Sequence, residues 1–135
     1  MRQELIKKTE RTGPVLIIED DPDIAEVLQY CLQKGNFETR VALNAEEGIS
    51  ASLDKNNPPS IILLDLLLPG MNGIELCRRI RSEPLTRSTP ILIVTAKASE
   101  IDWATALNVG ANDYIIKPFS LSEVIARVNH LLGRD

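Results

Sequence analysis

Five short, apolar runs rich in β-branched residues recur along the chain, and they cover residues 15–19, 37–41, 60–64, 91–95 and 113–116. The first, third and fourth runs are apolar at nearly every position. Near-continuous apolar runs of this length are typical of parallel strands that are covered on both faces. The pattern therefore predicts five strands in a largely buried sheet.

Segments with helical periodicity separate the runs, and each opens on a side chain that can cap a helix. Asp21, followed by Pro22, predicts the start of the first helix, and Gly35 predicts its end. The caps expected for the other four helices are Asn44, Asn72, Ser99 and Ser120. Because strand and helix alternate along the whole chain, we expect an α/β sandwich built on a parallel sheet with five helices.

Composition narrows the class of protein. The chain has 135 residues, of which 44% are hydrophobic and 25% charged, which favours one ordinary globular domain. Its net charge of −4 argues against direct binding of nucleic acid by this chain, because such proteins usually carry a basic face. Cys31 and Cys77 lie far apart without metal-ligand spacing, and we interpret both as reduced core thiols.

No segment predicts export or membrane insertion. The N-terminus lacks the apolar core of a signal peptide, and the longest apolar stretch, residues 61–68, is too short to span a bilayer. A cytoplasmic location without membrane association is therefore the expectation.

Polar residues follow the predicted strands at their carboxyl ends. Parallel strands joined by right-handed crossovers end along one edge of the sheet, where ligands bind. The residues expected at this edge are Glu19, Asp20 and Asp21 after the first strand, Asp65 after the third, Thr95 in the fourth and Lys117 after the fifth.

Asp65 stands out because it interrupts an otherwise apolar run. A buried, unpaired carboxylate costs several kcal/mol, so Asp65 needs a counter-charge. Neighbouring acids with no His or Cys favour Mg²⁺ over zinc, because Mg²⁺ prefers oxygen ligands. With its charge offset by the metal, Asp65 could attack a phosphoryl group, while Lys117 and Thr95 stabilise the phosphoryl oxygens.

Four segments, residues 15–22, 61–73, 91–96 and 110–119, together resemble one family, the receiver domain of two-component response regulators. They read VLIIEDDP, IILLDLLLPGMNG, ILIVTA and GANDYIIKPF. The resemblance covers residues 14–133 and leaves residues 1–13 as an N-terminal tail. It implies a flavodoxin-like three-layer sandwich with a five-stranded parallel sheet in the order 2-1-3-4-5.

The resemblance also implies roles for single residues. Asp65 is the expected phosphoacceptor. Glu19 and Asp20 are the expected acidic pair, with Asp20 binding Mg²⁺ directly, Glu19 binding through water, and Leu67 adding a backbone carbonyl. The residues alone leave open a pair of Asp20 with Asp21, and we favour the first pair because Asp21 resembles a helix cap.

The remaining roles concern the phosphoryl oxygens and a conformational switch. Thr95 and Lys117 are expected to hold the oxygens, and Tyr114 matches an aromatic residue that moves inward when Thr95 approaches the phosphate. The Lys117–Pro118 bond matches one that is cis in the family.

These roles imply a phosphorylation switch rather than an enzyme with a separate substrate. A sensor histidine kinase or phosphotransfer protein would donate to Asp65 in a self-catalysed transfer, later reversed by autodephosphorylation. The switched face would comprise the fourth helix, fifth strand and fifth helix. The signal for a phosphorylation-dependent homodimer is mixed, because Asp113 and Arg127 match charges used in dimers whereas Trp103 departs from the usual basic residue.

Two other functions are compatible with parts of the sequence. A receiver-like interaction module would not use phosphate, although the full set of site residues argues against it. A phosphatase of the haloacid dehalogenase type also uses an Asp nucleophile, but it expects a second Asp two residues later, where this chain has Leu67.

Overall fold

The central sheet has the predicted topology. The computed structural model describes residues 12–97 and 99–134. Five parallel strands form the sheet: β1 (Val15–Ile18), β2 (Thr39–Ala42), β3 (Ile61–Leu64), β6 (Ile91–Thr95) and β7 (Asp113–Ile116). Their order is β2-β1-β3-β6-β7. Counting only the strands of this sheet, the order is 2-1-3-4-5, as expected from the resemblance.

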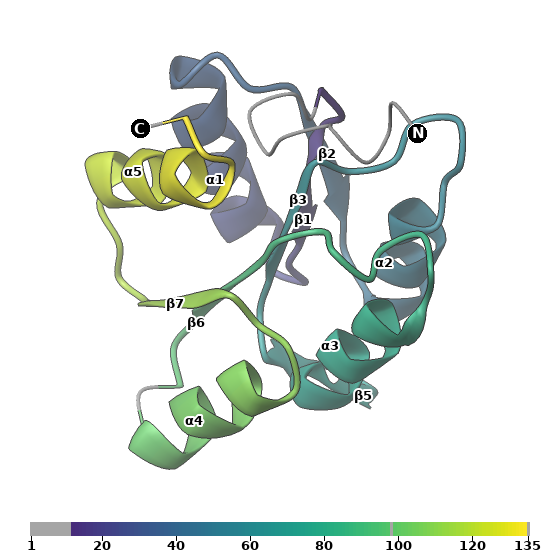
Figure 1. Cartoon of the computed structure of the whole chain (residues 1–135). Coiled ribbons are helices and arrows are strands. Elements are labelled where there is room, and N and C mark those ends of the chain that lie inside the picture. The colour runs from purple at the N-terminus through teal and green to yellow at the C-terminus, as the bar shows by residue number, and fades with distance from the viewer. Residues whose placement is uncertain (1–11, 98, 135) are drawn as a thin grey trace.

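Helices cover both faces of the sheet (Figure 1). α1 (Pro22–Lys34) and α5 (Leu121–Leu131) lie on one face. The other face carries α2 (Ala45–Ser52), α3 (Gly73–Ser82) and α4 (Glu100–Asn108). The prediction of a three-layer α/β sandwich with five helices is thus confirmed.

Alternation along β1 explains why the sheet has two apolar faces. Val15 and Ile17 pack into a core with residues of α1 and α5, whereas Leu16 and Ile18 pack into a core with residues of α2, α3 and α4. All four side chains are almost fully buried. Successive strand residues point to opposite faces, so an unbroken apolar run is what a doubly covered strand requires.

Each predicted helix cap is present. The Asp21 side chain accepts from the backbone N–H groups of Asp23 and Ile24, and Gly35 follows the last residue of α1. The N-terminal caps of the other four helices are Asn44, Asn72, Ser99 and Ser120. Each cap satisfies at least one of the first N–H groups of its helix, which have no partner within the helix.

β1 ends and β3 begins one residue inside the expected runs, and two larger differences from the expectation concern β2 and a loop. β2 begins at Thr39 rather than at residue 37, because the N–H of Phe37 donates to Leu32 O at the end of α1 instead of joining the sheet (3.0 Å). A short antiparallel pair, β4 (Leu67–Leu68) with β5 (Met71–Asn72), was not predicted. Two-residue strands are too short to show any periodicity.

Glycine shapes the loop that contains this pair. Gly70 turns the chain with a φ of 79°, a conformation that other residues rarely adopt. A Cβ on Gly73 would lie 2.3 Å from Leu66 Cα, so only glycine lets the start of α3 approach the end of β3. The N–H of Gly73 also donates to Leu66 O, so the loop is held against the residue that follows Asp65.

The two cysteines are core residues, as predicted. Cys31 and Cys77 are buried and unbonded, and burial raises the pKa of each thiol. Across residues 12–97 and 99–134, no helix combines the length and apolar character needed to cross a bilayer.

Candidate functional site

The backbone brings the predicted residues to one edge of the sheet. The N–H of Asp65, just after β3, donates to Ile18 O at the end of β1 (3.1 Å). The N–H of Lys117, just after β7, donates to Thr95 O at the end of β6 (2.8 Å). These bonds extend the sheet by one step beyond its regular strands. Residues far apart in sequence thereby end side by side, as expected for parallel strands.

Both carboxylate oxygens of Asp65 are hydrogen-bonded. Oδ1 accepts from Thr95 Oγ1 at 2.7 Å and from the Leu67 N–H at 2.9 Å. Oδ2 accepts from Lys117 Nζ at 2.8 Å. Asp65 is only 5% exposed, and Thr95 is fully buried. The cost of burying the Asp65 charge is thus offset by a cation and two hydrogen-bond donors.

Lys117 joins the two carboxylates that flank it. Its Nζ lies 2.7 Å from Glu19 Oε1 and 2.8 Å from Asp65 Oδ2. Burial lowers the pKa of Lys117, but its hydrogen bonds with Asp65 and Glu19 outweigh this effect and leave the pKa raised. Burial raises the pKa of Glu19, although the hydrogen bond from Lys117 opposes the shift. Lys117 therefore remains an ammonium that balances two buried acids.

Three acids form a cluster beside Lys117. Carboxylate oxygens of Glu19, Asp20 and Asp65 lie within 4.8 Å of one another. The Asp21 carboxylate, in contrast, accepts from the first turn of α1. The geometry thus joins Glu19, rather than Asp21, to Asp20 and Asp65. Three carboxylates this close repel one another unless cations offset them, so the cluster is suited to a hard divalent ion.

A chain of contacts leads from Asp65 to Tyr114. Thr95 Oγ1, which donates to Asp65, also accepts from the Lys97 N–H at 3.4 Å. The carbonyl of Lys97 accepts from the Tyr114 hydroxyl at 2.7 Å. Tyr114 is 7% exposed, and burial followed by the charges of Asp102 and Asp65 raises its pKa. Tyr114 is therefore buried and connected to Asp65 through Lys97 and Thr95.

Lys97 was missed by the sequence reasoning. Its backbone connects Thr95 with Tyr114, and its Nζ lies 3.5 Å from Asp102 in α4. A backbone carbonyl is present in every residue, so no residue type marks this role. Its place two positions after Thr95 is the only signal in the sequence.

Comparison with known proteins identifies the family. Residues 15–129 match the response regulator receiver domain. The chain belongs to this family. The receiver domain is 41% identical over 121 residues to the response regulator ArlR of Staphylococcus haemolyticus, covering 90% of this chain and 53% of that protein. The chain thus spans about half the length of the curated relatives it matches.

Solved structures agree with this assignment. A two-component response regulator from Clostridium difficile superimposes with a TM-score of 0.83 at 32% identity, covering 90% of this chain and 97% of that one. The receiver domain of the Francisella response regulator 1452 gives a TM-score of 0.78 at 32% identity, covering 90% and 98%. The chain is therefore a signalling domain of the phosphorylation-accepting receiver type. The Lys117–Pro118 bond is cis, as the resemblance implied.

The receiver domain carries an apolar, exposed surface on α4 and β7. Trp103 is 49% exposed, so it is a surface residue of α4 rather than part of the core. Trp103, Ile116 and Arg127 contribute to the lining of one shallow hollow there. Arg127 Nη1 lies 2.7 Å from Asp113 Oδ1 in the same chain. The two charges that match the dimer pattern are thus paired with each other in this structure.

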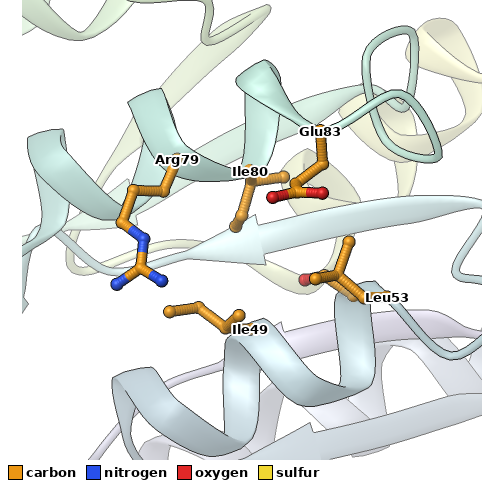
Figure 2. A pocket seen from close by; sticks show the side chains of 6 residues that line it. Ile49, Leu53, Arg79, Ile80 and Glu83 are labelled. Atoms are coloured by element: carbon orange, nitrogen blue, oxygen red, sulfur yellow. The ribbon is translucent and has the colours of Figure 1, made fainter.

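A second hollow of the receiver domain lies between α2 and α3 (Figure 2). Arg79 of α3 and Glu83, which follows that helix, line it together with Ile49 of α2 and Leu53, which follows α2. None of its lining residues belongs to the Asp65 cluster. The reactive groups of this domain therefore lie at the sheet edge and not in this cavity.

Proposed function

We propose that Asp65 accepts a phosphoryl group from a phosphohistidine of a sensor histidine kinase or phosphotransfer protein. One observation supports this most directly: a buried carboxylate holds a cation and a hydroxyl on different oxygens, beside two further acids. Such groups stabilise the transition state of phosphoryl transfer, which needs positioning and positive charge more than covalent chemistry from the protein.

The reaction transfers phosphorus between two nucleophiles. An Asp65 oxygen attacks phosphorus while the P–N bond of the donor breaks, and the electron pair of that bond leaves with the imidazole. Lys117 and Thr95 already contact Asp65, so they can bind the phosphoryl oxygens with little movement. Autodephosphorylation reverses the state when water attacks phosphorus and Asp65 leaves as a carboxylate.

The acidic cluster fits a magnesium ion. The carboxylate oxygens of Glu19, Asp20 and Asp65 lie within 4.8 Å of one another, and hard oxygen donors suit Mg²⁺. Asp20 and Asp65 would bind the ion directly, Glu19 through water, and Leu67 through its backbone carbonyl. When bound, Mg²⁺ supplies positive charge that offsets the acids and the phosphoryl oxygens.

Phosphorylation would be transmitted through Thr95 and Tyr114. Phosphorylation changes the charge of Asp65 and thereby the position of Thr95, which donates to it. The backbone of Lys97 connects Thr95 to the Tyr114 hydroxyl. The surface of α4, β7 and α5 would then differ between the two states.

We also propose domain bounds, a location and partners for the chain. Residues 14–133 form the receiver domain, preceded by a tail of residues 1–13, of which 1–11 lie outside the described residues. The domain acts in the cytoplasm on protein partners, without binding nucleic acid or membranes directly. A homodimer through Asp113 and Arg127 requires their pairing within the chain to be exchanged for pairing between chains.

Acyl-phosphate labelling tests the assignment of Asp65. With Mg²⁺ and acetyl phosphate, the wild-type chain should gain one acid-stable, base-labile phosphoryl group, and Asp65→Asn should gain none. Asp54→Asn, which removes a partly exposed carboxylate paired with Arg40, is the control and should label normally. Full labelling of Asp65→Asn would refute the assignment, and an unlabelled wild type would favour the phosphate-independent interaction module.

A further inference from the structure

Arg81, at the end of α3, binds an unusually large set of backbone carbonyls. Its Nη1 lies 3.0, 2.8 and 2.8 Å from the carbonyl oxygens of Thr86, Arg87 and Thr89 in the loop before β6. Its Nε and Nη2 lie 3.2 and 2.8 Å from Gly110 O, which follows α4. All three nitrogens of the guanidinium therefore donate, and together they tie two loops to α3.

Asn112 extends this junction to the sheet. Its Oδ1 accepts from Arg81 Nη2 at 3.0 Å and from the Ile91 N–H at 2.8 Å. The Asn112 N–H donates to Ile91 O at 2.8 Å. The chain between α4 and β7 is thus bound both to α3 and to the first residue of β6.

Gly110 is matched to Arg81 in shape. Its φ of 120° is a conformation that side chains rarely tolerate. A Cβ there would also lie 2.9 Å from Arg81 Cγ and 3.0 Å from Arg81 Nε. The positive φ and the close approach of Arg81 both favour glycine at position 110, and the missing Cβ leaves room for the Arg81 side chain.

The rest of α4 is held much more weakly. Ala106 is the only buried residue of this helix, and Ile101 and Trp103 are 78% and 49% exposed. At its other end, α4 is connected to the Asp65 site by the Lys97–Asp102 ion pair and by the bond from the Lys97 N–H to Thr95. The C-terminal end of α4 is thus held by the hydrogen bonds of Arg81, whereas its N-terminal end is connected through Lys97 to Thr95 and Asp65.

We infer that Arg81 is a positioning residue that anchors the C-terminal end of α4, so that α4 moves about this end when Asp65 is phosphorylated. This inference rests on the proposed function, because it assigns a path to the switch. A helix that is anchored at one end turns a small displacement at Thr95 into a defined rotation. Without the anchor, the same displacement would be lost in loosening of the helix.

Trp103 provides the measurement, since it is the single tryptophan of the chain and lies in α4. The experiment records Trp103 fluorescence and amide exchange of residues 100–108 in the full chain, before and after saturating acetyl phosphate and Mg²⁺. Phosphorylation of Asp65 is quantified in the same samples. The variants are Arg81→Ala, Arg81→Lys and Gly110→Ala. The control is Arg79→Ala, which removes a neighbouring arginine of α3 that lines the hollow in Figure 2.

Arg81→Ala should be phosphorylated as fully as the wild type. Its unphosphorylated α4 should exchange about tenfold faster, because the lost charge-assisted bonds hold one end of the helix. The change in Trp103 fluorescence on phosphorylation should fall by about half or more, because α4 then loosens locally instead of rotating about a fixed end. Arg81→Lys and Gly110→Ala should lie between, and Arg79→Ala should match the wild type.

Both effects are required. An undiminished Trp103 response in phosphorylated Arg81→Ala overturns the inference even if exchange is faster, because Arg81 would then stabilise α4 without guiding it. Unchanged exchange overturns it as well. If Arg81→Ala does not fold, Arg81→Lys and Gly110→Ala decide by the same criteria. A wild-type chain without label refutes the proposed function instead, and the exchange comparison, which needs no phosphate, still shows whether Arg81 anchors α4.

Discussion

Two cations at opposite edges of the sheet, Lys117 and Arg81, have very different partners. Lys117 contacts the carboxylates of Glu19 and Asp65, at the carboxyl ends of the strands. Arg81 contacts backbone carbonyls and the amide oxygen of Asn112, at the amino ends of β6 and β7. Carboxylates can change charge by binding metal or accepting a phosphoryl group, whereas carbonyls cannot. A cation among acids is thus suited to a switch, and a cation among carbonyls to a fixed joint.

The side-chain types fit this division. A lysine ammonium is a compact charge on a flexible stem, so it can follow an oxygen that moves from a carboxylate to a phosphoryl group. A guanidinium has a planar set of donors that suits several fixed acceptors at once. Exchanging the two residue types should therefore weaken the contacts at both edges of the sheet.

Lys117→Met should give the largest loss of stability, about 3 kcal/mol, because breaking a buried ion pair leaves uncompensated acids. Added Mg²⁺ should restore part of the loss, since the ion would replace the missing positive charge beside Glu19, Asp20 and Asp65. Urea unfolding with and without MgCl₂ measures both effects. Lys55→Met, at an exposed position, is the control. A loss that Mg²⁺ leaves unchanged would contradict the proposed metal site.

Arg81→Ala should cost about 2 kcal/mol, because the carbonyls of the buried residues Thr86 and Thr89 lose a charged donor. Mg²⁺ should not relieve this loss, in contrast to Lys117→Met, since no acid of the metal cluster is involved. The same urea titrations measure it. The contrast between the two edges would fail if Mg²⁺ rescued both variants equally.

Gly110→Ala should cost about 1 to 2 kcal/mol, because the backbone conformation becomes strained and the new methyl group displaces Arg81. Gly70→Ala is a matched comparison, since its φ is also positive but a Cβ there would meet no atom within 4 Å. Only the Gly110 variant should couple with Arg81→Ala in a double-mutant cycle. Additive effects would show that Gly110 acts through its backbone alone.

The contrast also explains what the sequence could predict. The Asp65 site consists of side chains whose types mark their chemistry, and the parallel topology places Glu19, Asp65 and Lys117 at one edge. The acceptors of the Arg81 guanidinium, such as Gly110 O, and the Lys97 carbonyl that binds Tyr114 are backbone groups, which every residue carries. Neither could be read from residue types. The strand order came from the resemblance, because periodicity does not determine which strands are neighbours.

The boundaries of helices and strands also show that side-chain contacts are easier to predict than backbone contacts. Caps such as Asp21 and Ser99 were predicted because a side chain makes the contact, and both are present. The start of β2 was placed two residues early because Phe37 is apolar and buried, and its backbone bond to Leu32 leaves no signal in the sequence. Contacts between side chains and buried apolar runs were thus predictable, whereas contacts made only by the backbone were not.

A third cation, Arg40, gives the smallest expected effect, because it is an exposed version of a cation beside an acid. Its Nη1 lies 2.9 Å from Asp54 Oδ2. The hydrogen bond from Arg40, followed by one from the Asn56 N–H, holds the pKa of Asp54 below its ordinary value of 3.8. Because the folded pKa is the lower one, the pair contributes stability above the unfolded pKa and loses it as the pH falls through the folded pKa.

Asp54→Asn should therefore lower the urea midpoint slightly near neutral pH, and the difference from wild type should shrink as the pH falls below about 4. Salt should reduce the difference in midpoint, because exposed charges are screened. Mg²⁺ at equal ionic strength should not change this difference. Urea midpoints at two pH values and two salt concentrations measure it. A loss as large as that of Lys117→Met would mean that exposure does not separate these ion pairs, and that the Asp65 edge owes its effect to something other than burial.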